Sequence, residues 1–150
     1  MTSRIIAKDI KRLNQAVELT TETIKAIQEN KQLEHILLNA LLFGASSFYT
    51  GLEHLLKEKL KERGITMPQG DKSHKKLLDA TFREEILPQE LKSDLEGLAA
   101  VRHFARGAYG VKIKKELVLN DISRIPQIWE SIRHNIEQDK PEPPEHELTI

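Results

Sequence analysis

The sequence predicts an all-α, up-down helical bundle of about five helices. Apolar residues recur at three- and four-residue steps in several long segments, which is the spacing of one helix face. The strand-like alternation in "VKIKKELVL" has no second strand to pair with elsewhere in the chain. A length of 150 residues suits a single domain with one core. We therefore expect a helical domain at residues 1–139, followed by an extended or disordered proline-rich tail at 140–150.

The first two helices follow from the apolar pattern and from one glycine. The first segment alternates lysines and glutamates with an apolar stripe, made of Ile6, Ile10, Leu13, Val17, Ile24 and Ile27. A second helix is expected from about Gln32 to Arg63, with Gly64 as its C-terminal stop. Its first half is apolar on more than one side, which predicts the central, most buried helix. Its second half, "KEKLKERG", is expected to be solvated.

The later elements depend on caps and prolines. Asp71 or Ser73 is a candidate cap for a short helix, "HKKLLDATFREE", and Pro88 opens a helix that reaches about Arg106. "GAYGVKIKKELVLN" is expected to be a loop with one helical turn. Ser123 is the expected cap of the last helix, because Pro126 then falls in its first turn. The buried stripe predicted for this helix is Ile125, Ile128, Trp129, Ile132 and Ile136.

Composition narrows the class of protein. Lys plus Arg and Asp plus Glu each number 23, so any surface that binds a polyanion must be a local arrangement. The absence of cysteine excludes disulfides, a thiolate nucleophile and a cysteine-based zinc site. No two histidines have metal-ligand spacing with a supporting carboxylate, so we expect neither a metal nor a cofactor. The N-terminal segment "MTSRIIAKDIKRLNQ" is charged every few residues, unlike a signal peptide, and the longest apolar stretch is too short to span a membrane. We therefore expect a soluble, cytoplasmic domain without a membrane partner.

The stretch "RHFARGAYG", residues 102–110, concentrates groups that bind anions and transfer protons. On a continuous helix Arg102, Arg106 and Tyr109 share one face, whereas His103 points away from it. Two arginines one turn apart suit a phosphate, since guanidinium groups bind it bidentately and stay charged. On spacing alone, salt bridges between these arginines and the acidic faces of neighbouring helices are an equal alternative.

Three segments in order resemble the HEPN superfamily, and its HepT toxins in particular. They are "FYTGLEHLL" (48–56), "MPQGDKSHKKLL" (67–78) and "RHFARGAYGVKI" (102–113), and the resemblance spans about residues 5–138. The HepT signature is R-x-x-x-x-H-x-Y at the end of a late helix. Arg102, Gly107 and Tyr109 reproduce its spacing, with glycine in the place of the histidine.

The resemblance implies a homodimeric, metal-independent endoribonuclease that is the toxin of a toxin–antitoxin pair. Its substrate would be RNA, with tRNA as one candidate, and its partner an MNT-type nucleotidyltransferase antitoxin that attaches AMP to the motif tyrosine. Carried over, Arg102 stabilises the transition-state phosphate, Arg106 assists it, and Tyr109 accepts AMP. Glu53, His74 and His103 are auxiliary candidates, and a structural polar role is the simpler interpretation of Glu53 and His74.

Gly107 departs from the family pattern at the residue that transfers protons. Loss of one general acid–base group commonly costs about 10²–10⁴-fold in rate, so we expect impaired cleavage. Two alternatives stay open. One is a non-catalytic module that binds RNA or a nucleotide with Arg102, Arg106 and Tyr109. The other is a structural helical partner protein in which the arginines only make salt bridges.

Overall fold

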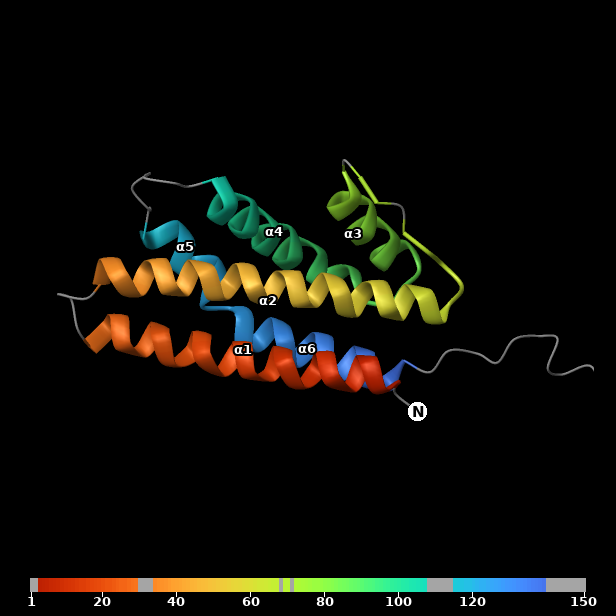
Figure 1. Ribbon diagram of the computed structural model, residues 1–150, viewed down its shortest axis with the longest axis horizontal. Helices are drawn as coiled ribbons and strands as arrows, with labels where there is room; N and C mark the ends of the chain where they lie inside the picture. The colour runs from red at the N-terminus through yellow and green to blue at the C-terminus, as the bar shows by residue number, and fades with distance from the viewer. Residues whose placement is uncertain (1–2, 30–33, 68, 71, 108–114, 140–150) are drawn as a thin grey trace, which may run out of the picture.

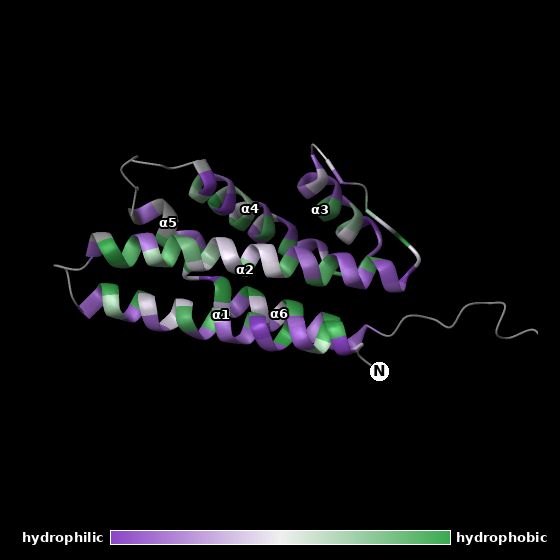
Figure 2. Ribbon diagram, viewed as in Figure 1, coloured by the Kyte–Doolittle hydropathy of each residue, from purple (hydrophilic) through white to green (hydrophobic). Residues whose placement is uncertain are grey.

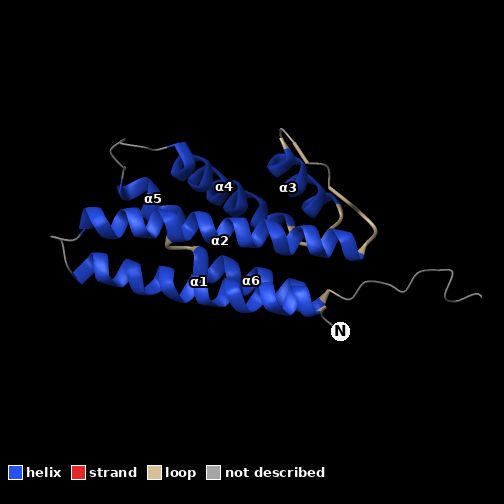
Figure 3. Ribbon diagram, in the orientation of Figure 1, coloured by secondary structure: helices blue, strands red, loops and turns tan. Residues whose placement is uncertain are grey.

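The all-α prediction is confirmed by a computed structural model. The structure describes residues 3–29, 34–67, 69–70, 72–107 and 115–139, and within them every regular element is helical (Figure 3). The predicted tail at 140–150 lies outside the described residues. The helices are α1 (Arg4–Glu29), α2 (Glu34–Glu62), α3 (Ser73–Arg83), α4 (Lys92–Gly107), α5 (Lys115–Ile122) and α6 (Ile125–Gln138), with a 3₁₀ turn η2 (Gln89–Leu91) before α4.

The α2 helix is the centre of the bundle (Figure 1). It runs antiparallel to α1 along almost its whole length, and α6 packs on α1. The α3, α4 and α5 helices lie on the other side of α2 and each contacts it. One helix therefore carries side chains toward both layers, which explains why its first half is apolar on more than one side. Figure 2 shows apolar residues recurring along α2.

The core follows the predicted stripes. Ile6, Leu13 and Ile27 of α1 are buried, and the other three residues of that stripe are packed against the core. Gly51 allows α1 to approach α2 closely, because a Cβ at this position would lie 3.2 Å from Leu13 Cδ2. In α6 the buried residues are the five predicted ones, Ile125, Ile128, Trp129, Ile132 and Ile136. The Trp129 indole donates a hydrogen bond to Asn14 of α1 at 2.5 Å.

Several predicted helix ends need correction. Gly64 does end α2, with a φ of 79° that favours glycine. Ser73, however, is the first residue of α3 and not its cap, because a turn in which its N–H donates to the Gly70 carbonyl starts the helix. The alternative cap, Asp71, lies outside the described residues.

The segment before α6 also differs from the prediction. Residues 115–122, expected as part of a loop with one helical turn, form the two-turn helix α5. Ser123 completes the end of α5, with its hydroxyl donating to the Asn120 carbonyl at 3.2 Å, so it does not cap α6. Arg124 occupies the cap position without a side-chain bond, and Pro126 lies in the first turn of α6 as expected.

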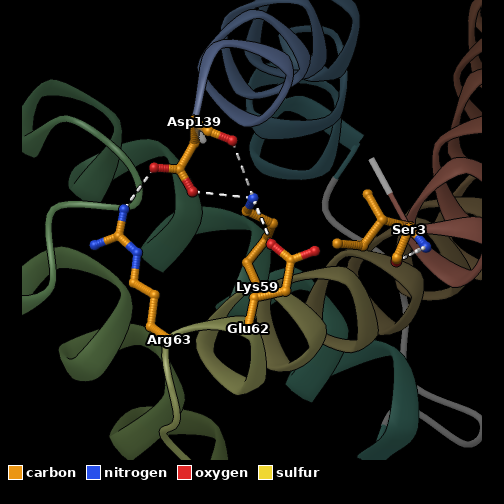
Figure 4. A network of polar contacts seen from close by, with 6 residues as sticks. Ser3, Lys59, Glu62, Arg63 and Asp139 are labelled. Atoms are coloured by element: carbon orange, nitrogen blue, oxygen red, sulfur yellow. Dashed lines mark hydrogen bonds and ion pairs between the residues drawn. The ribbon is translucent and has the colours of Figure 1, made fainter. Parts of the chain in front are cut away.

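A partly buried ion network joins the end of α2 to the end of α6 (Figure 4). Lys59 was expected on a solvated face, yet its side chain is 4% exposed and lies 2.9 Å from both Glu62 and Asp139. Arg63 pairs with Asp139 at 2.5 Å and donates to the Glu84 carbonyl at the end of α3. The segment "KEKLKERG" has few apolar residues and so looks solvated, but the ends of α2, α3 and α6 meet at this point and cover Lys59.

The charge on Asp139 stabilises this network. Burial of its carboxylate would raise the pKa, but hydrogen bonds from Lys59 and Arg63, and their positive charges, lower the pKa below its ordinary value. Because the pKa is lower in the folded state, the stabilisation is fully present above the unfolded pKa of about 4 and is lost as pH falls below it.

Asp139→Asn is expected to lower the free energy of unfolding at pH 7 by about 1.5–3 kcal/mol, since it removes charge-assisted hydrogen bonds to Lys59 and Arg63. Urea unfolding at pH 7 and below pH 4 measures this, and the difference from the unsubstituted chain should shrink at the lower pH. Asp79→Asn is the control, because Asp79 is exposed and makes no ion pair with the described residues. An equal effect of both substitutions would contradict the prediction.

Candidate functional site

Arg102 is anchored against the centre of α2. It lies in the last turns of α4, and its side chain is only 13% exposed. Its Nε donates a hydrogen bond to Thr50 Oγ1 at 3.1 Å and lies 3.9 Å from Glu53 Oε1. The anchoring uses the inner nitrogen of the guanidinium group. Neither terminal nitrogen makes a hydrogen bond or ion pair within the described part of the chain, so the fork for an anion is still available.

Glu53 is a buried carboxylate shared by two helices. It is 5% exposed and lies on α2, one turn after Tyr49 and Thr50. Its Oε2 is 2.6 Å from Nδ1 of His74 on α3, and its Oε1 faces Arg102 on α4. A buried carboxylate is costly unless it is paired and hydrogen-bonded, and these two side chains supply the partners. Glu53 thus brings together three predicted site residues from three helices.

Tyr49 lies under the same group. It is 1% exposed, and its hydroxyl has no hydrogen-bond partner among the described residues. Burial raises the pKa of the Tyr49 phenol, the negative charge of Glu53 raises it further, and the positive charge of Arg102 opposes this. The phenol is therefore neutral at ordinary pH and inaccessible to a reagent outside the bundle.

The remaining predicted site residues are placed less fully. Gly107 is the last residue of α4, and Tyr109 lies outside the described residues. Arg106 and His103 are exposed, and within the described ranges neither makes an ion pair. The alternative prediction, that both arginines form salt bridges with neighbouring helices, therefore applies to Arg102, which pairs with Glu53. It does not apply to Arg106 among the described residues.

Sequence reasoning did not single out Tyr49 and Thr50 as site residues. The signal was local, because residues 49, 50 and 53 are spaced three and four apart and share one face of a helix. The spacing of these residues does not indicate which helix packs against their shared face.

Another histidine–carboxylate pair lies away from this cluster. His54 Nδ1 is 2.5 Å from Asp9 Oδ2, which joins α2 to α1 on the other side of the bundle centre. The side chain of His54 is 56% exposed and that of Asp9 is 9% exposed. No arginine shares this carboxylate among the described ion pairs, so it lacks the anion-binding part of the Arg102 cluster.

The family comparison covers the helices that build the cluster. The family model described as "HepT-like protein" matches residues 40–140, from the first half of α2 to the end of α6. The chain belongs to the HepT-like family. In this HepT-like protein the matched region contains Thr50, Glu53, His74 and Arg102, whereas α1 lies outside it.

The other comparisons add no relatives of this HepT-like protein. Neither the curated proteins nor the solved structures contain a match to the chain. Among the described residues, no helix has the length and apolar character needed to cross a membrane.

Proposed function

We propose that this HepT-like protein is the toxin of a toxin–antitoxin pair, with a metal-independent endoribonuclease site that is impaired by Gly107. The observation that carries the proposal is the placement of Arg102, anchored through Nε on Thr50 and Glu53 near the end of α4. Membership of the HepT-like family gives this arginine its context. Arg102 and Gly107, in the spacing R-x-x-x-x-G-x-Y, occupy the place of the family motif.

In this function the 2′-hydroxyl of the RNA attacks the adjacent phosphate. Arg102 stabilises the charge that builds on the phosphate oxygens in the transition state, and its fixed position avoids the cost of orienting it during the reaction. Arg106, one turn further along α4 and exposed, assists in holding the RNA backbone. Gly107 has no side chain to transfer a proton, so cleavage is slow.

A non-catalytic module that binds RNA or a nucleotide is the second candidate, and Gly107 is the observation that favours it. Both candidates use Arg102 to bind a phosphate, but only the ribonuclease regains cleavage when a histidine is supplied at position 107. If Arg102→Ala left RNA binding unchanged, it would count against both.

Homodimerisation through the exposed apolar face beside this cluster is part of the proposal. Ile36 and Phe43 of α2 are 66% and 74% exposed, and their spacing of seven places them on one helix face. Phe104 of α4, two residues beyond Arg102, is 37% exposed. Exposed large apolar side chains gathered on two helices are typical of an interaction site. A two-fold dimer there would bring two copies of Arg102 into one positively charged cleft.

Phe43→Glu is expected to convert a dimer at micromolar concentration into a monomer, because it places a charge at the centre of this apolar face. Sedimentation equilibrium of the two proteins measures the change. Leu19→Glu, at an exposed apolar residue of α1, is the control and should leave the mass unchanged. A monomeric unsubstituted chain, or a dimer that survives Phe43→Glu, contradicts this interface.

Modification of Tyr109 is the proposed means of neutralisation. Tyr109 follows Arg106 by three residues in the sequence and suits AMP transfer, because the arginines can neutralise the incoming phosphate, and the transfer needs no histidine at 107. The attached phosphodiester then carries about one negative charge and competes with the RNA backbone. Incubation with ATP, magnesium and a cognate MNT-type antitoxin is expected to add mass in units of AMP.

Peptide mapping locates the adduct, and Tyr109→Phe should abolish it. The chain offers an internal control in Tyr49, which is 1% exposed and so should stay unmodified. Absence of an adduct, or an adduct on Tyr49, contradicts the assignment of Tyr109 as the acceptor.

A further inference from the structure

The Glu53 carboxylate holds one imidazole and one guanidinium group on its two oxygens. His74 Nδ1 lies 2.6 Å from Oε2, and Arg102 Nε lies 3.9 Å from Oε1. The two side chains come from α3 and α4, which lie on the same side of α2 (Figure 1). One carboxylate therefore holds a group that can bind a phosphate and a group that can transfer a proton.

We propose that His74, oriented by Glu53, is the proton-transfer group of this site and carries the cleavage that remains in the presence of Gly107. This inference rests on the proposed ribonuclease function. It assigns to His74 the catalytic role and to Glu53 a positioning role, whereas a structural tie between α2 and α3 is the simpler alternative.

The exposure of His74 leaves it accessible to a substrate, and the arginine on the same carboxylate distinguishes it from His54, which is similarly exposed on Asp9. The Glu53 side chain is 6% exposed, but the imidazole that binds it is 52% exposed. One edge of the imidazole is bonded, and Nε2 has no hydrogen bond with the described residues.

The carboxylate also selects the tautomer. A carboxylate accepts hydrogen bonds, so Nδ1 carries the proton that it donates to Glu53. In the neutral imidazole Nε2 is then the unprotonated nitrogen, ready to accept a proton. The same arrangement of a buried carboxylate, an oriented histidine and a reacting hydroxyl serves nucleophilic catalysis on other folds.

The step balances without a metal or an oxidant. Nε2 of His74 accepts the proton of the 2′-hydroxyl, and the 2′-oxygen forms a bond to phosphorus. The bond between phosphorus and the 5′-oxygen breaks, and that oxygen takes a proton from water. The imidazolium returns its proton to the hydroxide so formed, which leaves a 2′,3′-cyclic phosphate and a free 5′-hydroxyl. Arg102 stabilises the phosphate oxygens throughout.

His74→Asn tests the inference in the chain as it exists. The asparagine amide can replace Nδ1 as the donor to Glu53 but has nothing in place of Nε2. The rate of cleavage of a mixed-sequence oligoribonucleotide is expected to fall by at least about 10²-fold. Formation of the cyclic phosphate product measures this rate. His134→Asn, on the surface of α6, is the matched control and should leave the rate unchanged. Thermal unfolding of each variant checks that the bundle is intact.

Two further measurements separate catalysis from structure. Free imidazole is expected to restore cleavage to His74→Ala, which a structural defect would not allow. Glu53→Gln should cost less kcat in the His74→Ala chain than in the unsubstituted chain, because the part of its effect that acts through His74 is then already lost and only the part that acts through Arg102 remains. Full additivity of the two losses, or no rescue by imidazole, overturns the inference.

The failure of the inference is distinct from that of the proposed function. If His74→Asn cleaves like the unsubstituted chain while Arg102→Ala does not cleave, His74 is not the proton-transfer group but the ribonuclease proposal stands. If the chain with Gly107 shows no cleavage at all, the inference is overturned, and the proposed function is then judged by Gly107→His alone. His74→Asn should also reduce the cleavage rate less in the Gly107→His variant than in the unsubstituted chain, because the histidine at position 107 can then transfer the proton. An equal reduction in both backgrounds overturns the inference.

Discussion

Gly107→His is expected to raise the rate of RNA cleavage by about 10²–10⁴-fold, because it supplies a general acid–base group at the motif position that lacks one. Gly107 is the last residue of α4, five residues after Arg102, so the new imidazole follows the anchored arginine at the motif spacing. The rate of cleavage of total tRNA and of a mixed-sequence oligoribonucleotide measures the gain. Growth arrest on expression of the variant is a second readout.

The control for this substitution is Gly110→His, which adds the same side chain outside the motif spacing and should leave the rate unchanged. An equal gain from both variants would show that the position of the imidazole is unimportant. If Gly107→His yields neither cleavage nor growth arrest, the ribonuclease function is contradicted, and the RNA- or nucleotide-binding module becomes the better account.

Arg102→Ala is expected to lower cleavage by the Gly107→His variant by about 10²–10³-fold, the usual cost of removing one donor aimed at transition-state charge. Arg102→Lys should recover only part of the loss, since an ammonium group retains the charge but not the planar fork. The change in kcat under single-turnover conditions, together with RNA binding by filter retention, measures the effect.

The control for the arginine is Arg83→Ala, because Arg83 is exposed on α3 and its one ion pair with the described residues is a long contact of 3.5 Å to Glu84. Arg102→Ala also leaves Glu53 with one cationic partner fewer, so thermal unfolding should accompany the kinetics. Arg102→Lys keeps that partner's charge and so separates stability from catalysis. If both Arg102 substitutions left the rate of the Gly107→His variant unchanged, this residue would not belong to the site.

The sequence by itself determined the fold class and much of the core. Apolar residues at helical spacing specify which face of a helix is buried whatever covers it, so the stripe of α6 was predicted residue by residue. Gly64 ended α2 as expected, because a positive φ is a local property of the chain. The motif spacing from Arg102 to Gly107 was also readable, since both residues belong to one helix.

Features that depend on what a helix meets were decided only by the tertiary structure. Lys59 looked solvated in its own segment but is buried, because Asp139 after the end of α6 pairs with it and the end of α3 lies close enough for Glu84 to bind Arg63. Ser123 looked like a cap for α6, yet α5 extends to it and uses it at its own end.

The candidate site shows the same division. Arg102 could be chosen from its motif, but its partner Thr50 is 52 residues earlier in the chain, and Glu53 and His74 are 21 residues apart. No periodicity along one helix relates residues on three helices. Their meeting at one carboxylate follows from the packing of α3 and α4 on the same side of α2, where a buried charge requires partners from whichever helices cover it.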